Sequence, residues 1–116
     1  KTVVQVSTMT LDHHAIARQF VVMPDTNANG SPDIAVLVRN QQTGALSIET
    51  HDAATGTPLH TIAADRMFRP DDLAVVSDMN GNGVAELAHS GVNATGVIRS
   101  TQRDAVTGAI VTTVNY

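Results

Sequence analysis

The feature that most constrains the fold is an internal duplication. Residues 20–35 align with residues 73–88 at a shift of 53 positions, and both segments read as an apolar run, a polar loop and a second apolar run. With one residue removed, the same register continues from Thr55-Gly56 to Thr107-Gly108. Two separate motifs do not fall into one register by chance, so the chain contains two copies of one structural unit.

Each copy has the pattern of four β-strands. In the first copy, residues 20–23 form a short continuous apolar run, which is typical of a strand buried on both faces. Residues 33–39 resume extended apolar sequence, and residues 46–51 alternate apolar and polar side chains, as a half-buried strand does. The Thr55-Gly56 turn then leads into a fourth strand. Each unit is therefore predicted to be a four-stranded antiparallel meander.

The segments between and before the repeated strands are less regular. Residues 8–19 are predicted to be an irregular crossover, with a short helix as the alternative, because the counterpart at residues 61–72 contains Pro70. Residues 2–9 resemble the fourth strand of a unit that is otherwise missing. The predicted organisation is the outer strand of a preceding unit at residues 1–10, a first unit at residues 11–63 and a second unit at residues 64–116.

Four-stranded units repeated at this period are the blades of β-propellers, and such blades bury their faces only against neighbouring blades. Two blades cannot close a ring of the usual four to eight. The predicted fold is therefore all-β, with two four-stranded antiparallel propeller blades and a spare N-terminal strand, as part of a larger or oligomeric propeller. The predicted partners are further blades, in the same chain or in identical chains.

Two nine-residue loops follow the first strand of each unit and place oxygen-bearing side chains at positions 1, 3, 5 and 9, with glycine at position 6. A hard cation such as Ca²⁺ takes six to eight oxygen ligands, and a wrapped loop presents alternate residues to it. The alternative is that these side chains only cap turns by bonding backbone amides. The predicted ligands are Asp25, Asn27, Asn29, Asp33 and the backbone carbonyl of Ser31 in the first loop, and Asp78, Asn80, Asn82, Glu86 and the backbone carbonyl of Val84 in the second.

These loops resemble the DxDxDGxxD loops of FG-GAP, integrin-type β-propeller repeats, and the strands that follow them resemble the next strand of that family. The resemblance implies blades in which each loop joins the first two strands and holds Ca²⁺. It also implies a secreted, extracellular or cell-surface protein. Asparagine at positions 3 and 5 departs from the usual aspartates, which predicts two weak calcium sites. The Phe-Gly and Gly-Ala-Pro signatures of the family are not evident.

Bulk properties exclude several other classes. The net charge of −4 leaves no basic patch for nucleic acid, and no apolar run approaches the roughly 18 residues of a membrane-inserted helix. Cysteine is absent, so disulfides and thiolate metal sites are not possible. No nucleophile motif such as Gly-x-Ser-x-Gly occurs, so the chain is predicted not to be an enzyme.

The predicted function is that of a non-catalytic, calcium-binding propeller segment of a secreted or surface protein, serving adhesion or the binding of a protein or carbohydrate ligand. One alternative is a structural protein that self-assembles into a ring or filament through open blades. The other is that these blades are the scaffold of a polysaccharide-active extracellular enzyme.

Overall fold

The computed structural model describes residues 15–64, 72–92 and 94–116 of the chain. These residues form strands and turns without any helix, and hence without one that could cross a membrane. The strands are β1 (Ala15–Met23), β2 (Asp33–Asn40), β3 (Leu46–Asp52), β4 (Pro58–Ala64), β5 (Asp72–Val76), β6 (Glu86–Val92), β7 (Ile98–Asp104) and β8 (Ile110–Asn115).

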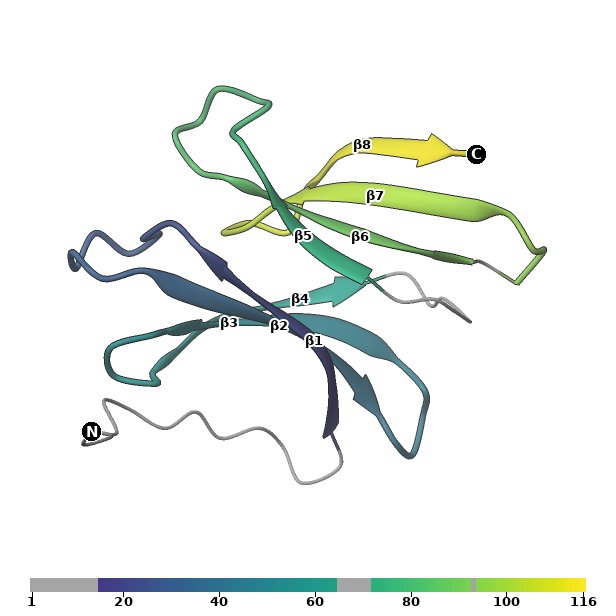
Figure 1. The fold of residues 1–116 in the computed structure, drawn as a ribbon, viewed down its shortest axis with the longest axis horizontal. Coiled ribbons are helices and arrows are strands. Elements are labelled where there is room, and N and C mark those ends of the chain that lie inside the picture. Colours follow the sequence, from purple (N-terminus) through teal and green to yellow (C-terminus); the bar gives the residue numbers. More distant parts are fainter. Residues whose placement is uncertain (1–14, 65–71, 93) are drawn as a thin grey trace, which may run out of the picture.

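The eight strands form two separate antiparallel sheets, in which neighbours along the chain are neighbours in the sheet (Figure 1). Sheet 1 has the order β1-β2-β3-β4, and sheet 2 has the order β5-β6-β7-β8. The Thr-Gly turns need a left-handed backbone that glycine adopts without steric cost, and Gly56 and Gly108 both have φ of 75°. The prediction of two four-stranded antiparallel units is confirmed.

Strand β1 begins earlier than predicted. Residues 15–19 belong to it and pair with the end of β2, so the prediction of an irregular crossover is wrong for these residues. A register shift between Ala17 and Gln19 lets the extended chain continue through Arg18. The remainder of the predicted crossover, and the predicted spare strand at residues 2–9, lie outside the described residues.

One apolar cluster holds the two sheets together. Strands β1 and β5 lie beside each other, and the sheets pack face to face behind them (Figure 1). Burying such side chains removes apolar surface from water, which is the main favourable term in folding. The buried members are Met23, Ala35, Leu37, Ile48 and Ile62 from sheet 1, and Leu73, Leu87 and Ala105 from the second repeat.

The repeat alignment shows that the two sheets use opposite faces for this contact. Leu73 and Leu87 of sheet 2 lie in the cluster, and their counterparts in sheet 1 are Phe20 and Ile34, which do not. Leu37 of sheet 1 lies in the cluster, and its counterpart in sheet 2 does not. The contact is therefore head to tail: one face of the first unit packs on the opposite face of the second.

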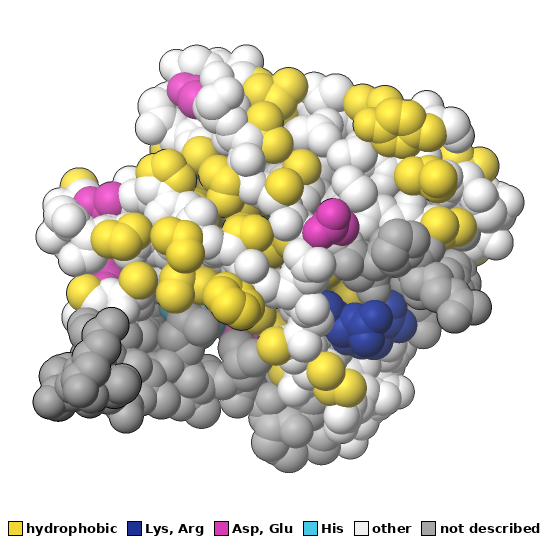
Figure 2. Space-filling view, in the orientation of Figure 1, with side chains coloured by type: hydrophobic (Ala, Val, Ile, Leu, Met, Phe, Trp, Pro, Cys, Tyr) yellow, Lys and Arg dark blue, Asp and Glu magenta, His cyan; other side chains and the backbone are white. Residues whose placement is uncertain are grey.

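This arrangement leaves one face of β1 uncovered among the described residues. Val21 packs against the cluster and Met23 is part of it, whereas Phe20 is 69% exposed and Val22 is 64% exposed. The prediction of burial on both faces is wrong for Phe20 and Val22, because among the described residues only one face of β1 meets another sheet. Figure 2 shows hydrophobic side chains gathered on the side where β1 and β5 lie.

Leu37→Ala should lower the free energy of unfolding by about 2–5 kcal/mol, because Leu37 is fully buried at the contact between the sheets. Phe20→Ala is the matched control, since it removes a larger but mostly exposed side chain and should cost much less. Urea unfolding of both variants measures the difference. Equal losses for the two variants would contradict the assignment of the core.

Candidate metal centre

The two acidic loops leave their sheets on the same side of the molecule (Figure 1). Each joins the first strand of its sheet to the second, so that the ninth loop position, Asp33 or Glu86, is also the first residue of β2 or β6. The last oxygen-bearing side chain of each loop is therefore anchored in a sheet, whereas the earlier ones lie on exposed turns.

The first aspartate of each loop organises the turn around itself. Oδ2 of Asp25 accepts a hydrogen bond from the amide of Gly30 at 2.7 Å, and Oδ2 of Asp78 accepts one from Gly83 at the same distance. Both glycines stand at position 6 with φ near 85°, as the predicted sharp turn requires. The two loops therefore share one wrapped backbone. At position 4 of the first loop, Ala28 also has a left-handed backbone, with φ of 61°.

The carboxylates at position 9 are fully buried, with 0% exposure for both Asp33 and Glu86. One oxygen of each lies against its own loop: Asp33 Oδ2 accepts from the amide of Thr26 at 2.6 Å, and Glu86 Oε2 accepts from the amide of Met79 at 2.8 Å. The other oxygen of each, Oδ1 or Oε1, has no hydrogen-bond partner among the described residues. A buried polar atom without a partner is costly, and a bound water or cation is one way to satisfy it.

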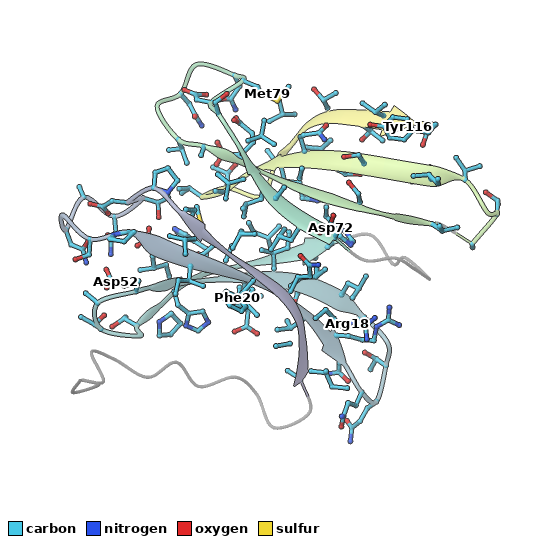
Figure 3. The ribbon with its side chains drawn as sticks, viewed as in Figure 1. Arg18, Phe20, Asp52, Asp72, Met79 and Tyr116 are labelled. Atoms are coloured by element: carbon cyan, nitrogen blue, oxygen red, sulfur yellow. The ribbon has the colours of Figure 1, made fainter. Side chains whose placement is uncertain are left out.

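A second buried carboxylate stands directly across the sheet from each of these. Asp52 pairs with Asp33 between β2 and β3, and Asp104 pairs with Glu86 between β6 and β7. Asp52 and Asp104 are each 1% exposed, and Figure 3 shows Asp52 at the end of sheet 1 near the loop. Like charges at directly opposed positions of a sheet are destabilising, and both repeats place two acidic residues at such positions.

Asp52 and Asp104 were missed as site residues by the sequence reasoning. The signal for them was present, because each begins an Asp-Ala-x-Thr-Gly turn motif, at residues 52–56 and 104–108, that occurs in both repeats. That motif was interpreted only as a turn. The structure brings it to the loop: the amide of Ala53 bonds the carbonyl of Pro32, and the amide of Ala105 bonds the carbonyl of Ala85.

Each of these aspartates divides its two oxygens between the turn and the loop. In sheet 2, Oδ1 of Asp104 accepts from the amides of Val106 and Thr107 at 2.9 and 2.8 Å. Its Oδ2 accepts from the side-chain amide of Asn82 in the loop. In sheet 1, Oδ2 of Asp52 accepts from Asn29 in the same way, with a longer bond of 3.4 Å from Asn27.

These hydrogen bonds decide the ionisation of the two aspartates. Burial alone would raise the pKa of Asp104, but the hydrogen bonds from the amide of Thr107, the side chain of Asn82 and the amide of Val106 outweigh it. Together they lower the pKa to about 2 from an ordinary value of 3.8. In Asp52, burial is likewise outweighed by equivalent bonds, and its pKa is lowered. Both groups are carboxylates at neutral pH.

The predicted ligands thus lie in two loops of matching shape. Among the described residues, no three or more His, Cys, Asp and Glu side chains converge into a group that could hold a metal ion. A cation in either loop would therefore depend on asparagine and backbone oxygens as well as on carboxylates. The loop hydrogen bonds also agree with the turn-capping alternative, but turn capping does not account for the unpartnered oxygens of Asp33 and Glu86.

The residues present fit a hard cation. The buried, unpartnered oxygen at position 9 is the kind of donor that Ca²⁺ prefers, and the other oxygen-bearing side chains of each loop are grouped around a left-handed turn at its glycine. Comparison of the chain with known protein families, curated proteins and solved structures found no match. The resemblance to FG-GAP repeats stays a prediction.

Acid should destabilise the calcium-free protein through Asp104. Because its pKa is lower in the folded state than in the unfolded chain, it stabilises the fold above pH 3.8, and this contribution is lost as the pH falls toward 2. Asp104→Asn should therefore reduce the dependence of unfolding free energy on pH in this range. The control is Asp72→Asn, at an exposed position on β5. Unfolding in EDTA at several pH values measures both, and unchanged pH dependence in Asp104→Asn would refute the assignment.

Proposed function

We propose that the chain is a non-catalytic, calcium-binding pair of β-propeller blades that serves adhesion or the binding of a partner. The observation that carries this proposal is the fully buried carboxylate at position 9 of each loop, with one oxygen unpartnered and a second buried carboxylate directly across the sheet. A divalent cation would satisfy the oxygen and offset the repulsion between the two carboxylates. The same arrangement recurs in both repeats.

The residues that would hold Ca²⁺ are those at positions 1, 3, 5, 7 and 9 of each loop. Each loop itself contributes two carboxylates, Asp25 and Asp33 or Asp78 and Glu86, with asparagine amides between them. Low ligand charge weakens binding, and extracellular sites of this kind have Kd values of about 10⁻⁴–10⁻³ M. Such sites would fill where calcium is abundant, which supports a secreted or cell-surface location.

The head-to-tail contact between the sheets supports the propeller. Phe20 and Val22, exposed on sheet 1, are the counterparts of Leu73 and Val75, which pack at the contact between the sheets. Another unit offering the face that carries Leu37 would cover them in the same way. A head-to-tail contact of this kind continues until a ring closes or a filament forms.

The opposite face of sheet 2 is more polar than the face that sheet 1 buries. Ser90 and Ser100 stand where sheet 1 has Leu37 and Ile48, and Gln102 Nε2 donates to Ser100 Oγ at 2.7 Å. An identical chain would therefore meet the apolar face of sheet 1 with a polar surface. This difference favours other repeat units as neighbours over identical chains.

Calcium should raise the melting temperature, because a ligand that binds only the folded state stabilises it. At a calcium concentration about 100 times Kd the gain is about 2.7 kcal/mol per site, and EDTA should reverse it. Calorimetric titration should give two sites in the native chain and one in Asp33→Asn, which removes one buried carboxylate. Mg²⁺ should shift the melting temperature less, since it demands a tighter octahedral site.

Glu49→Gln is the matched control for the calcium measurement, because Glu49 is a carboxylate of β3 outside the loops. It should leave two sites. A melting temperature that does not respond to calcium at up to about 100 mM, about 100 times the weaker Kd, would rule out the calcium-binding function. Two sites in Asp33→Asn would rule out the first loop as one of them.

The head-to-tail packing can be tested by placing on sheet 2 the apolar side chains that sheet 1 buries at the contact between the sheets. The double variant Ser90→Leu/Ser100→Ile should self-associate, because its new apolar face can cover Phe20 and Val22 of another copy. Adding Val22→Asp should abolish the association, whereas adding Gln41→Asp on an exposed turn should not. Sedimentation measures the mass, and a double variant that stays monomeric, or one whose association survives Val22→Asp, would count against a repeated head-to-tail contact.

A further inference from the structure

A hydrogen bond between two side chains joins each loop to the turn after the third strand of its sheet. In the second repeat, Asn82 Nδ2 donates to Asp104 Oδ2, and in the first repeat Asn29 Nδ2 donates to Asp52 Oδ2. Both asparagines stand at loop position 5, and both aspartates begin the turn motif. The contact therefore belongs to the repeating unit.

The chemistry of an amide makes this contact directional. An asparagine side chain binds a hard cation only through its carbonyl oxygen, because its nitrogen carries two hydrogens and is a donor. An ionised carboxylate accepts hydrogen bonds but cannot donate one. Asp104 therefore fixes the nitrogen of Asn82 on its own side. The oxygen of Asn82 accepts from the amide of Val84 at 2.9 Å and keeps a second lone pair for a ligand.

We propose that Asp104 and Asp52 are positioning residues of the calcium loops, each holding the amide of Asn82 or Asn29 with its oxygen directed to the cation. This inference rests on the calcium-binding function proposed above. The buried, unpartnered oxygens of Glu86 and Asp33, directly across the sheet from these aspartates, are the independent indication of a ligand there.

The proposal also accounts for asparagine at position 5 in both loops. An aspartate at residue 82 or 29 would place a carboxylate against Asp104 or Asp52, and two carboxylates in contact repel each other. An asparagine keeps an oxygen for the cation and offers a nitrogen to the aspartate. In each pair the carboxylate of the turn is thus the acceptor that orients the amide, and the amide oxygen in the loop is the ligand.

The test is a calcium titration followed by the backbone amide resonances of Gly30 and Gly83, which report the two loops separately within one folded molecule. In Asp104→Asn, the side-chain NH2 of the new asparagine would face the side-chain NH2 of Asn82. Two donors cannot bond each other, so Asn82 would rotate its amide and turn its own oxygen away from the loop. Calcium affinity reported by Gly83 should fall about 10- to 100-fold, as is usual when the partner of a metal ligand is lost. The affinity reported by Gly30 should not change.

A second pair of variants separates positioning from the other roles of Asp104. Aspartate at residue 82 presents an oxygen in either orientation and needs no orienting partner. The loss caused by Asp104→Asn should therefore shrink to less than about threefold in the Asn82→Asp background, since the interaction energy of a double-mutant cycle isolates the contact. An equal loss in both backgrounds would mean that Asp104 acts on the ion directly or only on the turn, and would overturn the proposal.

Two controls make the result decisive. Val106→Ala changes a side chain of the same turn while keeping the amide that bonds Asp104, and should leave the affinity of both loops unchanged. If Asp104→Asn does not fold, Asp52→Asn read at Gly30 tests the same pair in the first repeat. If neither glycine responds to calcium in the native chain, the proposed function fails. If both respond and neither aspartate variant weakens binding, only the positioning role fails.

Discussion

Each repeat buries two acidic side chains on strand residues directly opposite each other, and the loop and turn beside them supply their hydrogen bonds. Burying a charge is expensive unless hydrogen bonds or a counter-charge offset the loss of water. Asp52 and Asp104 obtain their bonds from turn amides and from loop asparagines. Asp33 and Glu86 obtain fewer, and keep one oxygen unpartnered. One carboxyl group of each pair therefore has both oxygens hydrogen-bonded and the other does not, and a cation would fill the unpartnered position.

The head-to-tail contact determines where each loop lies relative to the neighbouring unit. Val84 stands at position 7 of the second loop, and its side chain packs against the cluster between the sheets. The predicted ligand at this position is its backbone carbonyl, so the same residue would hold the ion and touch the preceding unit. A cation in this loop would therefore support the contact between units as well as the loop itself. Ser31 occupies the equivalent place in the first loop.

The strands, the turns and the shape of the loops could be predicted because they depend on local pattern. Alternation, the Thr-Gly turns and the duplication were sufficient for two meanders. The exposure of Phe20 and Val22 could not be predicted, because burial depends on which other sheet is present and not on the strand's own sequence. The role of Asp52 and Asp104 also could not be predicted, because it depends on strand register. The register places Asp52 opposite Asp33, 19 positions away in the chain, and Asp104 opposite Glu86, 18 positions away.

The buried cluster and the loops depend on different interactions, and this difference determines how calcium would act. The buried cluster consists of side chains from the strands and from the turn at Ala105, and it does not require a cation. The loop, by contrast, is joined to the sheet by hydrogen bonds to buried carboxyl groups. Removing calcium would therefore loosen the loops first, because most of their residues are exposed. In a propeller the loop would also contact the neighbouring blade. The cation would therefore stabilise the contacts between blades more than the fold of each blade.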